Sequence, residues 1–130
     1  MIPHTPPMRF PLYGGRVRLP EVHPMCVDGV YPALALVELA AQAAGSAVAE
    51  ALAAEAHAEG RAPTAHGGML VEIESATITR PVVPAGEVVA LDVRLERVMG
   101  ALRRYRVRID GVLEVGLTLR IQGPDVGEAA

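Results

Sequence analysis

Residues 32–45, PALALVELAAQAAG, decide how this chain folds. Proline suits the first position of a helix, because the N–H that it lacks has no helical partner there. The run that follows is rich in alanine and leucine, the strongest helix formers. We expect a helix from Ala33 to about His57, stopped by Gly60 and Pro63. A helix that is apolar on nearly every side needs cover from other parts of the structure.

Polar side chains interrupt this helix at every fourth residue: Glu38, Gln42, Ser46 and Glu50. This spacing places them on one slowly drifting stripe. A solvent-facing stripe is the simplest interpretation, and it stays open for Ser46 and Glu50. Glu38 differs because its neighbours in the sequence are leucine and valine. A carboxylic acid in apolar surroundings tends to keep its proton near neutral pH, which is the state that a general acid needs.

Composition limits the class of protein. A chain of 130 residues suits one domain with a real core, and because only 3% of the residues are aromatic, aliphatic side chains must build that core. The net charge of −3 gives no reason to expect nucleic-acid binding. The single cysteine excludes an internal disulfide, and no basic segment followed by an apolar one marks a leader at the N-terminus. An acid inside the helix argues against a membrane span. We therefore expect a cytoplasmic protein.

The chain divides into three parts by composition. Residues 1–13 are rich in proline and are expected to form an extended, mobile arm. Residues 14–122 form the domain, which begins with a short strand at 16–19 and a loop at 20–31 that contains His23. Residues 123–130 are expected to be a flexible tail.

The segment after the helix is typical of β-structure. Residues 70–79 are rich in β-branched side chains, and their alternation slips near Glu74 and Ser75, which indicates a β-bulge. Residues 81–86, with two prolines and a glycine, are expected to form a turn.

Clear alternation between polar and apolar residues follows. It predicts strands at 87–96, 104–109 and 113–121. Asp110-Gly111 predicts a two-residue hairpin between the last two. The sequence thus predicts an α+β domain, in which an antiparallel sheet with one apolar face curls around the helix and a second copy of the chain covers the rest.

Three segments resemble proteins of the hotdog fold, and within that fold the 3-hydroxyacyl-[acyl-carrier-protein] dehydratases. Residues 36–45 are similar to the central helix of that family, with its acid, its Ala-Gln pair and its glycine. Residues 73–84 are similar to its strand and its Arg-Pro-Val-Val-Pro turn, and the hairpin at 110–111 to its last strand pair. Together they cover about residues 22–121.

The resemblance implies a function in fatty acid biosynthesis. In that family a loop histidine removes the α-proton of a 3-hydroxyacyl thioester, and an acid on the central helix protonates the departing hydroxyl. The two residues come from different subunits of a dimer. By this resemblance Glu38 is the acid and His23 the base. Substrate-binding positions are Pro32 and Ala33, at the helix start where a backbone N–H holds the thioester carbonyl, and Gln42.

The same resemblance implies the partners. They are the acyl thioesters of acyl carrier protein or of CoA, a second copy of the chain in a homodimer, and a further assembly of dimers as an open alternative. No metal and no cofactor is implied.

The sequence departs from the family at the histidine. His23 lies fifteen positions before Glu38, one more than the usual spacing, and the residues after it are Pro-Met-Cys where the family has Phe-Pro-Gly. Two other functions therefore stay open. One is a hotdog thioesterase, in which Glu38 or Asp28 activates water. The other is a non-catalytic acyl-binding protein.

Other candidate residues have simpler interpretations. Cys26 could be a nucleophile paired with His23, but neither residue has a recognisable nucleophile context, and a small buried residue is the simpler interpretation. His23, Cys26 and Asp28 could together imitate a metal site, but no second cluster of ligands supports one. Asp28 is expected to cap the turn before the helix, and His66 to be exposed in a glycine-rich loop as a spare base. A group of arginines on the outer sheet face is either a solvated surface or a landing patch for an acidic carrier protein; it comprises Arg94, Arg104, Arg106 and Arg108.

Overall fold

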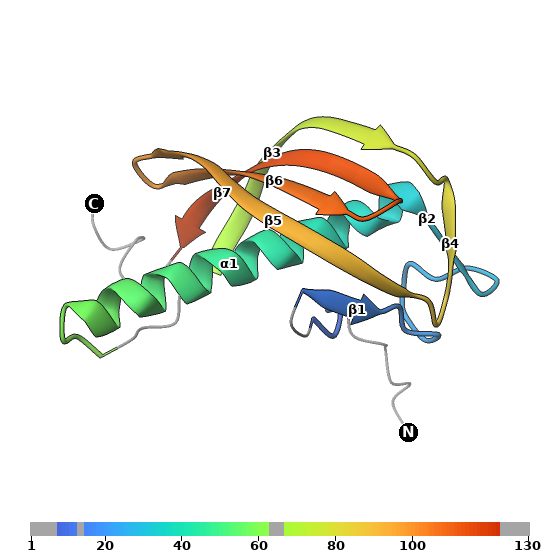
Figure 1. The fold of residues 1–130 in the computed structure, drawn as a ribbon, viewed down its shortest axis with the longest axis horizontal. Helices are drawn as coiled ribbons and strands as arrows, with labels where there is room; N and C mark the ends of the chain where they lie inside the picture. The colour runs from blue at the N-terminus through green and yellow to red at the C-terminus, as the bar shows by residue number, and fades with distance from the viewer. Residues whose placement is uncertain (1–7, 13–14, 63–66, 123–130) are drawn as a thin grey trace, which may run out of the picture.

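One long helix lies along a curved antiparallel sheet, and the sheet wraps over it (Figure 1). The computed structural model describes residues 8–12, 15–62 and 67–122. A 3₁₀ turn, η1 (Ala33–Leu36), leads directly into the helix α1 (Val37–Ala58). The fold class is therefore α+β, as the sequence predicts.

Two sheets accompany the helix. Their strands are β1 (Arg16–Arg18), β2 (Val30–Pro32), β3 (Gly67–Ile78), β4 (Val82–Pro84), β5 (Val88–Met99), β6 (Leu102–Ile109) and β7 (Leu113–Gln122). The large sheet has the order β1-β5-β6-β7-β3, and β2 pairs with β4 in a second, two-stranded sheet. All of these pairs are antiparallel. β1 and β3 are the edge strands of the large sheet.

The core lies between α1 and the inner face of the sheet. The alternation in β6 and β7 turns Tyr105, Val107 and Ile109 inward, together with their partners on β7. The helix contributes mostly small side chains, so it approaches the sheet closely. Its buried residues are Val37, Leu39, Ala40, Ala43, Ala44, Val48 and Ala56.

The segment Ala33–Ala58 is long and apolar enough, by length and composition, to cross a membrane. In the structure it contacts β3, β5, β6 and β7 instead. Its apolar residues thus serve as those of a core helix do.

The ends of the helix agree with the sequence, with one refinement at the start. Pro32 still belongs to β2, with φ −61° and ψ 136°, and it precedes a 3₁₀ turn rather than an α-helical one. At the other end the glycine predicted as a stop, Gly60, has φ +71°. A residue without Cβ adopts this left-handed conformation at no steric cost, so the helix ends there.

Irregular pairing bends the sheet. The register of β3 against β7 shifts between Leu70 and Glu72 and again between Ile73 and Ser75. The second shift confirms the bulge expected near Glu74. A third shift lies on β5, between Leu95 and Arg97. Such bulges increase local twist, which lets a sheet curve around a helix.

Two predictions about turns were wrong. Residues 81–86 are not simply a turn, because Val82–Pro84 form β4 against β2. Asp110-Gly111 is part of a three-residue connection, closed by the Val112 N–H donating to the Ile109 carbonyl oxygen at 2.9 Å. A glycine with positive φ in a three-residue loop is a common alternative to the two-residue turn.

A two-residue turn does occur elsewhere, at Asp28-Gly29. Both residues have positive φ, 52° and 77°, as a type I′ turn requires. Val27 and Val30 on either side exchange backbone hydrogen bonds of 2.9 and 3.1 Å. Asp28 therefore shapes the loop before the helix and does not cap it, since the start of η1 has no side-chain cap.

The described part of the N-terminal arm, residues 8–12, packs into the domain. Phe10, the one phenylalanine of the chain, is 2% exposed and belongs to the core. Its ring stacks on the ring of His23, with 4.1 Å between centroids, and Tyr31 lies beside both. An arm that moves freely is not what these residues show. Residues 63–66, which include His66, and the tail at 123–130 lie outside the described residues.

Candidate active site

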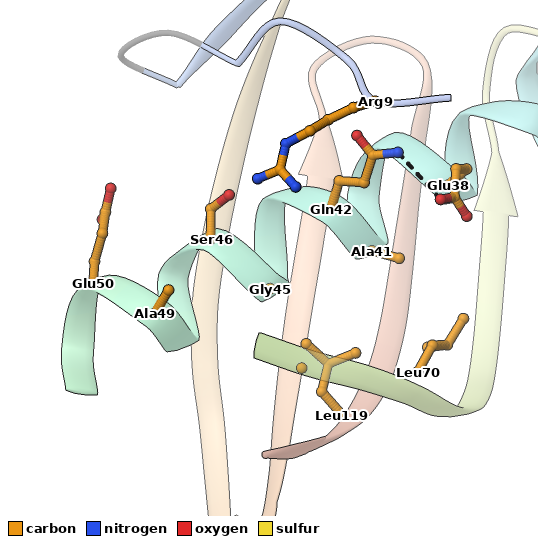
Figure 2. Close-up of a pocket in the computed structure, with 11 residues that line it drawn as sticks. Arg9, Glu38, Ala41, Gln42, Gly45, Ser46, Ala49, Glu50, Leu70 and Leu119 are labelled. Carbon is orange, nitrogen blue, oxygen red and sulfur yellow. Dashed lines mark hydrogen bonds between the residues drawn. The ribbon is translucent and has the colours of Figure 1, made fainter. Parts of the chain in front are cut away.

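A cleft of about 550 Å³ runs along one side of α1 (Figure 2). The polar stripe of the helix lines it, so the stripe faces a cleft rather than open solvent alone. Ala41, Gly45 and Ala49 lie between the polar residues, and their small side chains keep the cleft wide. Apolar side chains from β3 and β7 form the opposite wall, and Arg9 of the arm lies over the helix. The lining residues are Arg9, Glu38, Ala41, Gln42, Gly45, Ser46, Ala49, Glu50, Gly68, Leu70 and Leu119.

Gln42 organises this cleft. Its Nε2 donates to Glu38 Oε1 at 3.1 Å and to the Met8 carbonyl oxygen at 3.1 Å. Its Oε1 accepts the backbone N–H of Phe10 at 2.7 Å. The carboxylate of Glu38 is thereby oriented by the residue one helical turn later, and the same side chain fixes the arm to the helix. This four-residue spacing is the one that places both side chains on one face.

His23 lies outside the lining of the cleft, in the ring cluster. It is 6% exposed. The backbone N–H of Met25 donates to its Nδ1 at 3.1 Å, and Nε2 lies 2.8 Å from the Met8 carbonyl oxygen. A carbonyl only accepts, so Nε2 carries the proton and the imidazole is neutral.

Glu38 and His23 of one chain are nevertheless connected. Met8 accepts from both His23 and Gln42, and Gln42 donates to Glu38. Three hydrogen bonds of 2.8, 3.1 and 3.1 Å join the two side chains, so His23 Nε2 and Glu38 Oε1 are at most about 9 Å apart. The predicted acid and base are therefore neighbours within one subunit, separated by the arm.

Pro32 and Ala33 are not brought to the cleft. The Ala33 N–H donates to the Pro81 carbonyl oxygen at 2.8 Å, which ties the helix start to the segment before β4. A thioester carbonyl would have to displace this bond to be held there. Of the five predicted site residues, only Glu38 and Gln42 line the cleft. Their catalytic and binding roles stay predictions.

Tyr31 borders the histidine. Its hydroxyl donates to the Pro20 carbonyl oxygen in a short hydrogen bond. Burial, with a further contribution from Cys26, raises the pKa of Tyr31 to about 12. The phenol is therefore protonated at neutral pH and fixes the loop of His23. No pattern in the sequence indicated this contact, which joins positions eleven residues apart.

Two further groups were considered from the sequence. Among residues 8–12, 15–62 and 67–122, no cluster of three His, Cys, Asp or Glu side chains could hold a metal ion. On the outer sheet face, Arg104 pairs with Glu74 and Glu96, and Arg106 pairs with Glu96 and Glu114. Acidic neighbours thus surround arginines that were considered as a landing patch.

Comparison with known proteins adds a likeness of structure. No family model matches the sequence, and no curated protein matches it either. Among solved structures, a chain of the dehydratase heterocomplex ApeI:P from Xenorhabdus doucetiae superposes with a TM-score of 0.61. The match covers 87% of this chain and 75% of the other, at 20% sequence identity.

The fold is a hotdog fold. The long helix is the central element of that fold, and the five-stranded sheet is its wrapping. The hotdog fold expected from the helix motif and from the Arg-Pro-Val-Val-Pro turn is confirmed. At this level of identity the likeness extends to the fold and not to the chemistry.

Proposed function

We propose that this chain is a (3R)-hydroxyacyl-thioester dehydratase or hydratase. The observation that carries the proposal is the hydrogen bond from Gln42 to Glu38 inside a cleft with an apolar wall. A carboxylic acid oriented in this way suits proton transfer to a bound hydroxyl group. The apolar wall, from Leu70 and Leu119, suits an acyl chain. The likeness to a dehydratase complex supports the same class.

The proposed reaction is β-elimination. A base removes the α-proton, the electrons of that C–H bond form the double bond, and the β-hydroxyl leaves as water after taking a proton from Glu38. Gln42 occupies Oε1, so Oε2 is the oxygen that carries this proton. Hydration is the same sequence in reverse.

His23 is the proposed base. Its Nε2 carries a proton that the Met8 carbonyl oxygen accepts, so in this arrangement it has no free lone pair for the α-proton. The role therefore requires that Met8 moves off the ring and that the tautomer changes. A local turn of the Met8 carbonyl group would free Nε2, and the Met25 N–H would have to leave Nδ1 before the ring proton can move there.

A thioesterase is the second candidate, and the position of His23 favours it. Glu38 lies in the cleft without that histidine, and a carboxylate alone can activate water. Water would then attack the thioester carbonyl, the C–S bond would break, and the thiol would leave with a proton. Asp28, the other acid considered for this role, is exposed and does not line the cleft.

A homodimer is the proposed assembly, and the edge of the sheet supports it. β3 is an edge strand whose residues 69–78 are all exposed, and apolar residues are among them, such as Val71 and Ile73. Long, apolar edges of this kind tend to pair with another strand. A partner strand there would extend the sheet next to the cleft.

We propose acyl carrier protein or CoA thioesters as substrates and the cytoplasm as the location.

The test is direct. Purified protein is incubated with crotonyl-CoA and 3-hydroxybutyryl-CoA, and with a longer-chain pair, and the products are separated by chromatography. Interconversion of the enoyl and hydroxyacyl thioesters, lost in Glu38→Gln, would support the dehydratase. Glu55→Gln, on the same helix but outside the cleft, is the matched control. His23→Ala is assayed beside His23→Asn, because removal of a stacked ring can unfold the loop.

The other outcomes decide against the proposal. Release of free CoA that depends on Glu38 would establish the thioesterase. Absence of either reaction with CoA and with carrier-linked substrates, in a folded protein that still binds acyl thioesters, would establish a binding protein.

A further inference from the structure

The polar side chains that line the cleft differ in the number of hydrogen bonds that they make. Both amide hydrogens of Gln42 are engaged, with Met8 and Glu38, and its oxygen accepts from Phe10. The guanidinium of Arg9, in contrast, has no hydrogen bond or ion pair within the part of the chain that the structure describes. Arginine presents five N–H donors in a rigid fork. The guanidinium of Arg9 therefore has more free hydrogen-bond donors than any other side chain that lines the cleft, and it carries a positive charge.

Arg9 is also held in place. The residues on either side of it are both bonded to Gln42, Met8 through its carbonyl oxygen and Phe10 through its N–H. Phe10 is anchored further by its burial in the core. The backbone of Arg9 is thus fixed against α1, while its side chain reaches along the cleft between Gln42 and Ser46 (Figure 2). A donor with a fixed backbone loses less freedom when it binds a ligand.

The position of Arg9 sets the distance to the proposed acid. Gln42 and Ser46 follow Glu38 by four and eight residues, which is about 6 and 12 Å along a helix axis. A group bound by Arg9 therefore lies about one to two helical turns from the carbon that Glu38 serves. The wall across the cleft from Arg9 is apolar and is formed by Leu70 and Leu119 (Figure 2).

We propose that Arg9 binds a carboxylate carried by the acyl chain of the ligand, so that the cleft prefers acyl groups with an anionic end. Planar, bidentate pairing with a carboxylate is what a guanidinium does best. A phosphate would also suit a guanidinium. The phosphate of the pantetheine arm, however, lies at the far end of a long linker, beyond the one to two turns that separate Arg9 from Glu38. The proposal deepens the proposed function and rests on it for the direction of the acyl chain.

The test measures binding rather than turnover. Dissociation constants of octanoyl-CoA and of suberyl-CoA, which differ in the terminal carboxylate at equal chain length, are determined by calorimetry for the wild type, Arg9→Gln and Arg9→Lys. We expect the wild type to bind suberyl-CoA more tightly. In Arg9→Gln this preference should fall by up to about fivefold, the scale of an ion pair at an exposed side chain. Arg9→Lys should keep part of it. Arg97→Gln, an exposed arginine outside the cleft, is the control.

Three results would overturn the proposal. A preference that is equal in the wild type and in Arg9→Gln would show that Arg9 does not meet the acyl end. Equal weakening of both thioesters in Arg9→Gln would assign Arg9 to the CoA phosphates instead. If the wild type binds suberyl-CoA and octanoyl-CoA equally tightly, the cleft does not recognise a carboxylate at the end of the acyl chain. Because none of these measurements requires dehydration, a wild type that prefers suberyl-CoA but turns over neither substrate class would reject the proposed reaction and leave this inference standing.

Discussion

Gln42 joins three parts of the molecule through one side chain: the helix acid Glu38, the arm, and by way of Met8 the histidine loop. Such residues contribute more to stability than their exposure suggests. If the amide is removed, its partners lose hydrogen bonds together, and the Phe10 N–H is left at the edge of the core without an acceptor.

We expect Gln42→Ala to lower the free energy of unfolding by about 1–3 kcal/mol, the range for a buried group left unsatisfied. Urea denaturation measures it. Ser46→Ala, the next position of the same stripe, is the control and should change stability little. Equal stability of Gln42→Ala and Ser46→Ala would show that the arm is held by Phe10 packing alone.

Arg80, the arginine of the Arg-Pro-Val-Val-Pro turn, has a structural partner. It forms a two-pronged pair with Glu87, with N···O distances of 2.6 and 2.9 Å. These hydrogen bonds lower the pKa of Glu87 below its ordinary value of 4.5. A depressed pKa means that the pair stabilises the fold above that value and is lost as the pH falls through the lowered pKa.

Glu87→Gln should therefore have a slightly lower melting temperature than the wild type at neutral pH. The difference should shrink as the pH is lowered through the range below 4.5, where the wild-type carboxylate takes up its proton. Thermal melts across that range measure it, with the exposed Glu21→Gln as a control for loss of a charge. A difference that grows on acidification would contradict the pairing.

At the scale of elements, the helix contains a glycine that its own fold does not require. A Cβ on Gly45 would have no neighbour within 4 Å, and Gly45 lines the cleft. Glycine in a helix interior costs about 1 kcal/mol relative to alanine. The structural effect of Gly45 is to keep that side of α1 open.

Gly45→Ala should raise the free energy of unfolding by up to about 1 kcal/mol. Gly45→Leu should fold as well but fill the cleft, so binding of long-chain acyl thioesters is lost. Melting curves and calorimetric titration with octanoyl-CoA measure the two effects. Ala53→Leu, exposed on the same helix outside the cleft, is the matched control. Undiminished binding by Gly45→Leu would place the acyl chain elsewhere.

The elements that the sequence predicted well are those with a strong local signal. The alanine-rich run and Gly60 predicted the end of α1 within one residue, whereas its start was placed four residues early because Ala33–Leu36 form a 3₁₀ turn. Strict alternation predicted β6 and β7. The slip in alternation near Glu74 gave a bulge. Each of these depends on neighbours within a few positions, which is the range over which propensity and periodicity act.

The elements that it missed depend on distant partners. β4 pairs with β2, and its strand signal is weak because Val82 and Val83, although β-branched, lie between Pro81 and Pro84. The burial of Phe10 and the hydrogen bond of its N–H to Gln42 join positions 32 residues apart. Glu38 and Gln42 could be predicted to share a face, but the arm that covers them, and the enclosed state of His23, could not.

At the scale of the whole molecule, the β3 edge of the large sheet has no neighbouring strand among the residues that the structure describes. β3 carries exposed apolar side chains, among them Val71 and Ile73, 44% and 48% exposed. A single chain leaves them in water, whereas a second β3 would cover them.

We expect Ile73→Lys to shift the protein from dimer to monomer, because a charge directly in the pairing strand opposes edge-to-edge contact. Size-exclusion chromatography with light scattering measures the mass. Val98→Lys, on an equally exposed residue of β5 (53%), should leave the dimer intact. A wild type that is monomeric at high concentration would remove the homodimer from the proposal.

The alternation of arginines and acids over the outer face of the sheet has a consequence for encounters in solution. Positive charges on Arg104 and Arg106 lie within 4 Å of carboxylates on Glu74, Glu96 and Glu114. Opposite charges this close cancel each other's field within about one Debye length, roughly 8 Å at physiological ionic strength. An acidic protein approaching this face would feel little attraction until it is nearly in contact. The association rate constant of a protein that binds this face would therefore not be raised by long-range electrostatic attraction, and it would depend only weakly on salt concentration.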